Sequence, residues 1–143
     1  ILEVLILATS KFASHNRDAR WMTISGWVLT GLACAFMILD AGMKLLRLPI
    51  VLETTAALGW PTSSVAPLAV ILLISTALYA FPRTSILGAV LLTGYLGGAV
   101  ATHMRLENPL FSHILFGAYV GIVVWGGLFL RDERLRALFP LRR

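Results

Sequence analysis

The stretch from Trp27 to Leu39, WVLTGLACAFMIL, is apolar on every face that a helix could present. A surface helix of a soluble protein keeps one polar face, whereas a helix surrounded by lipid is apolar all round. The predicted span runs over residues 22–46, and its apolar run is broken only by Asp40 and Lys44. A helix needs roughly 20 apolar residues to cross a bilayer. The sequence therefore predicts a transmembrane helix here.

Three further apolar stretches follow, and they predict spans over residues 65–81, 86–106 and 110–130. The 143 residues are 58% hydrophobic and 13% charged, with a mean hydropathy of +0.84. A soluble domain this apolar would expose patches that an aqueous surface does not tolerate. We therefore expect an all-α integral membrane protein, a four-helix bundle with antiparallel, up-and-down topology and no separate soluble domain.

The segments outside the spans are short. Residues 1–20 are predicted to be an N-terminal extension without an assigned function, and residues 21–143 a single transmembrane domain. The stretch 47–64 is too polar to cross, and it predicts a short interfacial helix that ends at Gly59, with Trp60 at headgroup depth. Pro82 closes the second span in a tight turn, and Ser85 is the predicted N-cap of the third.

The basic residues predict the orientation of the bundle. Nine of the 12 Lys and Arg residues fall on the side that holds both termini and the turn at residues 82–85, and three fall on the other side. Because cytoplasmic loops carry an excess of Lys and Arg, both termini should be cytoplasmic. The segment 131–143 alternates apolar residues with arginines, which is typical of a surface helix lying on anionic lipid. The three residues on the outer side are Lys44, Arg47 and Arg105.

Several classes of function are excluded by the residues. The net charge of +5 comes from basic residues next to apolar spans, so it indicates lipid headgroups rather than nucleic acid. The single cysteine, Cys34, has no partner for a disulfide or a redox pair, and it is interpreted as a small buried residue. No Ser-His-Asp arrangement, phosphate-binding glycine loop or nucleotide fingerprint is present. We therefore predict no catalytic residues.

Polar residues gather where the first and third spans end. In an antiparallel bundle the first and third spans both end at the outer face of the membrane. There Glu53 or Trp60 would form a lid over a small polar pocket. Its ligand would be a quinone headgroup, a lipid headgroup or another small molecule. Alternatively, Asp40 and Lys44 form a neutralising pair in the first span, and the remaining residues contact the membrane interface. The predicted pocket residues are Asp40, Lys44, Tyr95, Thr102, His103 and Arg105.

No metal site is predicted in this cluster. One histidine with one carboxylate lacks the three or four ligands that a tight metal site needs. His113, near the start of the fourth span, would join the cluster only with a suitable rotation of its helix.

Two pairs of glycines recur at a spacing of four residues. Gly94 and Gly98 lie in the third span, and Gly117 and Gly121 lie in the fourth. Each pair places two positions without side chains on one helix face, where a neighbouring backbone can approach closely. The pairs are predicted to pack helices within the bundle or against other membrane proteins, including a second copy of the chain.

The sequence from Trp21 to Pro140 resembles the DoxX-like family of small bacterial membrane proteins. The resemblance rests on DAGMKLL at residues 40–46, GWP at 59–61, the run from Phe81 to Arg105, and WGGLFLR at 125–131 followed by Leu135. It implies a four-helix bundle in the bacterial inner membrane. By this resemblance Lys44, His103 and Arg105 fall on recurrent polar positions, and Asp40 on one that is often polar.

Two functions are consistent with these observations. The first is a non-catalytic accessory or structural subunit of a larger membrane complex, with other membrane subunits and lipids as partners. The second is a membrane subunit linked to an oxidoreductase that binds a quinone or a lipid headgroup in the outer pocket. No intrinsic cofactor is predicted in either case, because the sequence holds no metal or flavin motif.

Overall fold

The computed structural model describes the backbone of residues 2–138 and the side chains of residues 17–138, and within these ranges it contains helices and no β-strand. A short 3-10 helix (η1, Thr62–Ser64) leads into α3, and a π-helical turn (η2, Leu110–Ile114) precedes α5. The α-helices are α1 (Leu2–Leu45), α2 (Pro49–Ala57), α3 (Val65–Ala80), α4 (Ser85–Arg105), α5 (Phe116–Arg131) and α6 (Glu133–Leu138).

Four segments are long and apolar enough to cross a membrane, which confirms the predicted number of spans. They are Arg17–Leu45, Thr62–Ala80, Ser85–Arg105 and Leu110–Arg131. The first lies on α1, which continues without a break through the predicted boundary between residues 20 and 21. The end of this span and both ends of the other three agree with the sequence prediction to within three residues.

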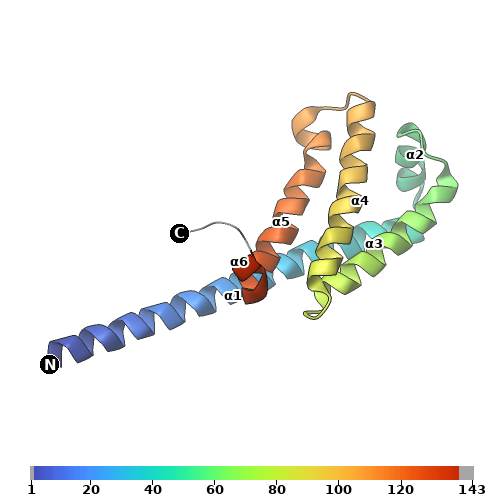
Figure 1. The fold of residues 1–143 in the computed structure, drawn as a ribbon. Helices are drawn as coiled ribbons and strands as arrows, with labels where there is room; N and C mark the ends of the chain where they lie inside the picture. The colour runs from blue at the N-terminus through green and yellow to red at the C-terminus, as the bar shows by residue number, and fades with distance from the viewer. Residues whose placement is uncertain (1, 139–143) are drawn as a thin grey trace.

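The four spans form a closed, antiparallel ring. Helix α1 packs against α3 and α5, and α4 packs against α3 and α5 on the opposite side of the ring. Figure 1 shows α1 and α3 side by side, with α4 and α5 rising steeply away from them. Consequently α3 and α5 lie diagonally opposite each other in the ring. We call the end that carries the turn 81–84 and α6 the basal rim, and the end that carries α2 and the turn 106–109 the distal rim.

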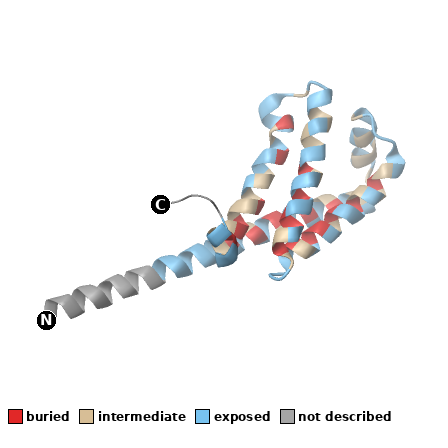
Figure 2. Cartoon of the chain, in the orientation of Figure 1, coloured by how far each residue is buried: buried red, intermediate tan, exposed pale blue. Residues whose placement is uncertain are grey.

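The core is small and lies where the helices cross. Figure 2 shows the buried residues concentrated there, while the outer faces of the spans are exposed. Large apolar side chains such as Leu39, Phe111 and Ile122 are among the exposed ones. An exposed apolar belt is the expected surface of a helix bundle whose solvent is hydrocarbon. The fully buried hydrophobic residues include Ala41, Ala69, Leu72, Tyr79, Ala89, Leu92, Val124 and Leu128.

The α3–α4 hairpin depends on one glycine. A Cβ atom at Gly88 would lie 2.1 Å from the backbone nitrogen of Tyr79, far inside van der Waals contact. Only a residue without a side chain lets the two backbones approach this closely. Gly88 therefore sets the distance between α3 and α4 near the basal rim.

Two local predictions have different outcomes. The interfacial helix is present as α2, and it is followed by Gly59 with a positive φ of +79°, which closes the turn before Trp60. Ser85 was predicted as the N-cap of the third span, and this prediction is wrong because the helix already begins at Ser85 and Thr84 occupies the cap position. The Ser85 hydroxyl donates instead to the Pro82 carbonyl at 3.2 Å.

The predicted C-terminal surface helix is present in part. Helix α6 covers Glu133–Leu138, and residues 139–143 lie outside the described part of the chain. Leu135 is buried, and the Arg136 guanidinium donates to the carbonyls of Phe129 and Leu130 at 3.1 and 2.6 Å. These contacts hold α6 against the last turns of α5.

Candidate functional site

The distal rim carries an ion pair at the end of α1. Lys44 and Asp40 are one helical turn apart, and the ammonium of Lys44 donates directly to the carboxylate of Asp40. Tyr95 of α4 lies within electrostatic reach of the same carboxylate. A charged residue near the membrane interior is costly unless it is paired, and here the two charges neutralise each other.

The loop after α2 is held against the end of α4 by two hydrogen bonds. Trp60 Nε1 donates to the Thr102 hydroxyl at 3.3 Å, and Arg105 Nη2 donates to the Leu58 carbonyl at 2.9 Å. Gly59 lies under this contact, since a Cβ atom there would be 2.9 Å from Arg105 Nη2. The loop thus covers the last turn of α4. The predicted alternative lid residue, Glu53, lies exposed on α2.

Two histidines meet next to this loop. The rings of His103 and His113 lie edge to face with 5.6 Å between their centroids, although His113 was ranked below the other candidates from sequence. The Asn108 amide nitrogen lies 2.9 Å from His103 Nδ1. Because an amide NH₂ can only donate, Nδ1 accepts, and the neutral ring carries its proton on Nε2. The π-helical turn η2 carries His113 toward α4.

Five of the six predicted pocket residues lie toward the distal rim, and Tyr95 lies midway along α4. The six fall into two groups. Asp40, Lys44 and Tyr95 form one group, and the end of α4 with its loop forms the other. Within residues 17–138 no hydrogen bond or ion pair joins the two groups.

The basal rim contains a polar cluster that sequence reasoning missed. The guanidinium of Arg131 lies 4.4 Å from the centroid of the Trp27 ring and 5.2 Å from that of Tyr79. Its Nη2 donates to the Tyr79 carbonyl at 2.8 Å. The Tyr79 hydroxyl donates to the Val124 carbonyl at 2.8 Å and lies 3.3 Å from the Thr30 hydroxyl. In the sequence, Arg131 signalled only membrane orientation, and Tyr79 looked like one more residue of a span.

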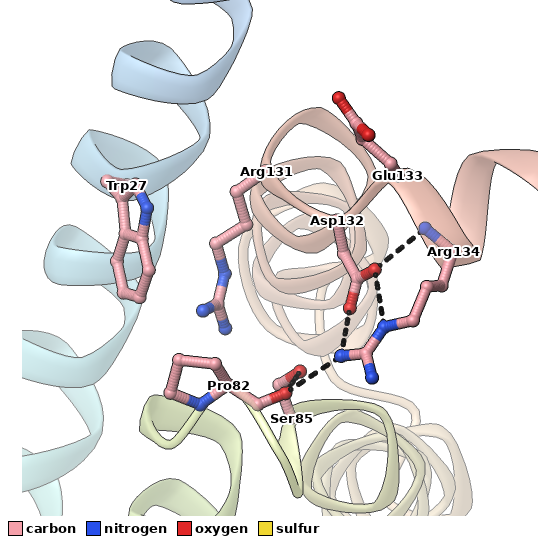
Figure 3. A pocket seen from close by; sticks show the side chains of 7 residues that line it. All are labelled: Trp27, Pro82, Ser85, Arg131, Asp132, Glu133 and Arg134. Carbon is pink, nitrogen blue, oxygen red and sulfur yellow. Dashed lines mark hydrogen bonds and ion pairs between the residues drawn. The ribbon is translucent and has the colours of Figure 1, made fainter.

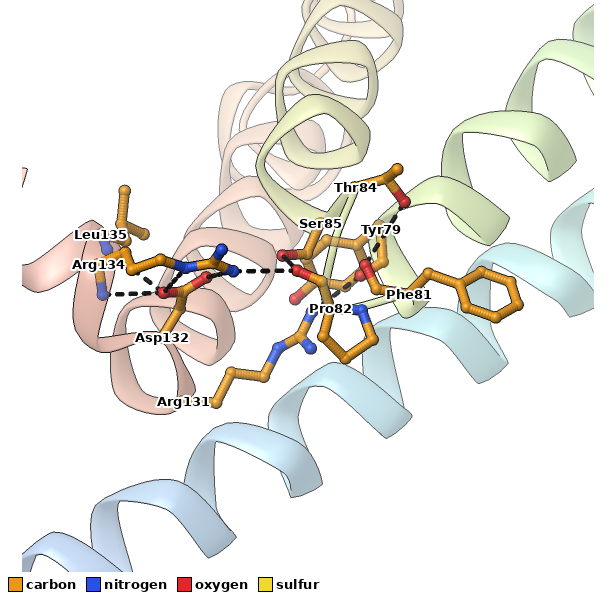
Figure 4. Close-up of polar contacts among 9 residues, drawn as sticks. All are labelled: Tyr79, Phe81, Pro82, Thr84, Ser85, Arg131, Asp132, Arg134 and Leu135. Carbon is orange, nitrogen blue, oxygen red and sulfur yellow. Dashed lines mark hydrogen bonds and ion pairs between the residues drawn. The ribbon is translucent and has the colours of Figure 1, made fainter.

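Asp132 caps the short helix that follows. Its Oδ1 accepts hydrogen bonds from the backbone nitrogens of Arg134 and Leu135 at 2.9 and 3.4 Å, and the Arg134 guanidinium contacts both carboxylate oxygens (Figure 4). Burial acts to raise the pKa of Asp132, but the hydrogen bonds from Arg134 and Leu135 outweigh it and lower that pKa below its ordinary value. Asp132 is therefore a stable carboxylate at neutral pH.

A cleft of about 300 Å³ opens beside this cluster. Figure 3 shows the Arg131 side chain directed into it between Trp27 of α1 and Pro82 of the α3–α4 turn. Arg134 reaches across the opening, where Nη2 donates to the Pro82 carbonyl at 3.3 Å. The lining residues are Trp27, Pro82, Ser85, Arg131, Asp132, Glu133 and Arg134.

A second, apolar hollow of about 410 Å³ lies between α4 and α5. Trp125 Nε1 donates to the Thr93 hydroxyl at 2.8 Å and so joins the two helices at one end of it. We call this hollow the α4–α5 groove. Its lining residues are Thr93, Leu96, Gly97, Val100, Gly117, Ala118, Gly121, Ile122 and Trp125.

The predicted packing glycines differ in their surroundings. A Cβ atom at Gly117 would lie 2.9 Å from Val100 of α4, and one at Gly121 would lie 3.9 Å from Leu96. By contrast, Cβ atoms at Gly94 and Gly98 would meet nothing within 4 Å in the described structure. The pair in α5 thus faces α4, whereas the pair in α4 is open to the surroundings of the bundle.

Comparison with protein families identifies the relationship that the fold suggests. The model of the DoxX-like family matches residues 28–127, from within α1 to within α5. The chain belongs to the DoxX-like family. The match confirms the resemblance seen in the sequence, and searches of curated proteins and of solved structures found no match. All six predicted pocket residues of this DoxX-like protein lie inside the matched segment, whereas Trp27, Arg131 and Arg134 lie just outside it.

The described residues also bear on metal binding. Among the side chains of residues 17–138, no three from His, Cys, Asp and Glu are grouped closely enough to hold a metal ion. The two histidines at the distal rim are accompanied by Asn108 and Ser112, which hydrogen-bond to their Nδ1 atoms.

Proposed function

We propose that this DoxX-like protein is a non-catalytic accessory subunit of a larger complex in the bacterial inner membrane. The α4–α5 groove would receive a transmembrane helix of a partner subunit. The observation that carries the proposal is the hollow of about 410 Å³ on the outer face of two membrane-spanning helices.

The small residues of the groove suit a helix better than a bulky ligand. Gly97 forms part of its floor, and a Cβ atom there would meet nothing within 4 Å. Gly94 and Gly98 are also open, but neither of them lines the groove. Apolar helices gain little from the hydrophobic effect inside a bilayer, so they associate where small residues allow close backbone contact. Gly97 meets this requirement within the groove.

Purification in mild detergent tests the proposal. We expect wild-type protein to migrate with a stoichiometric membrane partner, and Gly97→Leu to lose that partner because the new side chain fills the groove. Gly31→Leu is the matched control, since Gly31 lies on α1 and also has open space around it. Migration of the wild-type chain alone would refute the proposal, and a second copy as the sole partner would replace it with a homo-oligomer.

A quinone or lipid headgroup at the distal rim is the second candidate. Two polar side chains of α4 favour it. The Tyr95 hydroxyl makes no hydrogen bond within residues 17–138, and His103 lies about two turns further along the helix. It ranks second because Lys44 already donates to Asp40, and Arg105 to the Leu58 carbonyl. A ligand would have to compete for both cations.

Mass spectrometry of the purified protein decides this second candidate. The alanine variants His103→Ala and Lys44→Ala should each lower the amount of bound quinone or lipid. Unchanged occupancy in both variants would reject a ligand site at the distal rim.

A further inference from the structure

The cleft at the basal rim holds a cation that its own surroundings do not neutralise. Within residues 17–138, Arg131 forms no ion pair, and Nη2 is the one guanidinium nitrogen that donates a hydrogen bond. Its Nε is buried and has no partner among the described residues. A buried donor without an acceptor is unfavourable, and more so when it is charged. Because Nη1 also makes no hydrogen bond among the described residues, the side chain retains a donor for a group in the cleft.

The carboxylates in the cleft wall are already engaged by other arginines. Asp132 accepts from the backbone and guanidinium of Arg134, and Glu133 lies 3.6 Å from Arg136. Neither acid contacts Arg131 within ion-pair distance. The positive charge of Arg131 thus has no carboxylate partner among the described residues, and an anion in the cleft would neutralise it.

We propose that the basal cleft binds a phosphate group, held by Arg131 and closed over by Arg134. A guanidinium presents its N–H donors in a planar fork that matches phosphate oxygens. Stacking on Trp27 fixes the plane of the Arg131 fork, so little side-chain entropy is lost on binding. Arg134 lies at the opening with 71% of its side chain exposed, so it can turn toward a bound anion.

The phosphate group has two sources, an anionic phospholipid headgroup and free phosphate. The basal rim favours the lipid. Among residues 17–138 it carries six arginines against three acids, whereas the distal rim has three basic and three acidic residues. Such an excess concentrates anionic lipid at a membrane surface. The basal residues are Arg17, Arg20, Arg83, Arg131, Arg134 and Arg136 with Asp18, Asp132 and Glu133.

Trp27 places the cleft at a suitable depth for a headgroup. Trp27 is 45% exposed, and it lies beside Arg131, the last residue of the fourth span. Tryptophan is enriched at the headgroup level of membranes. The cleft lies away from the α4–α5 groove, so the phosphate site neither requires nor excludes the proposed partner helix.

Native mass spectrometry of the full chain in detergent tests the site. Phosphatidylglycerol is titrated against phosphatidylcholine, and three variants are compared: Arg131→Gln, Arg134→Gln and Arg83→Gln. Arg83 is the matched control, because it is an exposed arginine on the same rim without a contact among the described residues. Loss of one basic residue from a membrane surface costs about fivefold in affinity by general attraction alone.

We expect Arg83→Gln to show only this general loss for phosphatidylglycerol, and Arg131→Gln to exceed it by about tenfold. Arg134→Gln should fall between the two. Equal losses in all three variants, or no preference for phosphatidylglycerol in the wild type, would overturn the site. If Arg131→Gln does not fold, because it also loses the bond to Tyr79, the comparison of Arg134→Gln with Arg83→Gln decides.

Inorganic phosphate distinguishes the two sources of the group. Displacement of phosphatidylglycerol by millimolar phosphate supports a site that recognises the phosphate group alone. Retention of the lipid supports a site that also requires the acyl chains. Phosphate binding that depends on Arg131, without any lipid preference, supports free phosphate as the ligand. Binding of neither overturns the proposal.

Discussion

Arg131 at the end of α5 donates a 2.8 Å hydrogen bond to the backbone carbonyl of Tyr79 at the end of α3. Tyr79 returns the contact, because its hydroxyl donates to the Val124 carbonyl of α5 at 2.8 Å. The two helices are diagonal in the ring, so these bonds connect its opposite corners near the basal rim. Tyr79 is fully buried, so its hydroxyl bond is shielded from competing water.

Tyr79→Phe should weaken this connection. The variant keeps the ring and loses the hydroxyl bonds to Val124 and Thr30, each interhelical bond being worth about 0.6 kcal/mol on average in a membrane protein. We expect the free energy of unfolding in micelles to fall by about 1 kcal/mol. Tyr119→Phe is the control, since Tyr119 is 44% exposed on α5. Equal stability of the two variants would show that the hydroxyl bonds do not brace the helices.

Gly88→Ala should disrupt the hairpin of α3 and α4. The new methyl group would lie 2.1 Å from the Tyr79 nitrogen, which neither backbone can accommodate without moving. Overpacking of this kind costs about 3 kcal/mol or more. Gly94→Ala, with nothing within 4 Å of its new methyl group, should leave thermal stability unchanged. A Gly88→Ala protein that melts like the Gly94→Ala protein would contradict the close packing at this hairpin.

Asp132→Ala should loosen α6 from the bundle. The variant removes the acceptor for the Arg134 and Leu135 backbone nitrogens, and loss of an N-cap costs about 1 kcal/mol. Hydrogen exchange of residues 133–138 should therefore be faster than in the wild type, while exchange in α3 and α4 stays the same. Equal protection of α6 in both proteins would show that Asp132 does not cap it.

The same carboxylate makes stability depend on pH. Burial acts to raise the pKa of Asp132, but the hydrogen bonds from Arg134 and Leu135 outweigh it, so its folded-state pKa lies below the ordinary value of 3.8. Its charge therefore stabilises the fold above about pH 4, and this contribution is lost as the pH falls through the lowered pKa. The stability difference between wild type and Asp132→Asn should be constant from pH 7 to about pH 5 and shrink in stronger acid. A stability difference that grows toward acid pH would contradict the lowered pKa of Asp132.

The basic residues predict which side of the membrane each rim faces. A fluorescent protein fused after Arg143 should fold and fluoresce, because the C-terminus is expected in the cytoplasm. Alkaline phosphatase inserted after Glu107 should be active, since the distal rim is expected outside. Reversed reporter activities would overturn the predicted orientation.

The spans were predictable because length and apolar composition alone determine them. The pairing of Lys44 with Asp40 was also predictable, since residues four apart share one helix face. Contacts between distant segments were not. Tyr79 and Arg131 are 52 residues apart, and their contact depends on how α3 and α5 are rotated, which the hydropathy pattern of a lipid-facing helix does not specify. The packing role of Gly88 could not be predicted either, because the sequence does not distinguish it from the other glycines of α4.

Photocrosslinking in intact membranes tests the docking of a partner helix most directly. A benzoylphenylalanine residue replaces Ile122, which is 69% exposed in the α4–α5 groove, or Leu39, which is 67% exposed on α1. We predict a discrete, heavier protein adduct from position 122, with a partner chain identical to the one that copurifies, and lipid adducts alone from position 39. Lipid adducts alone from both positions would contradict a subunit role for the groove.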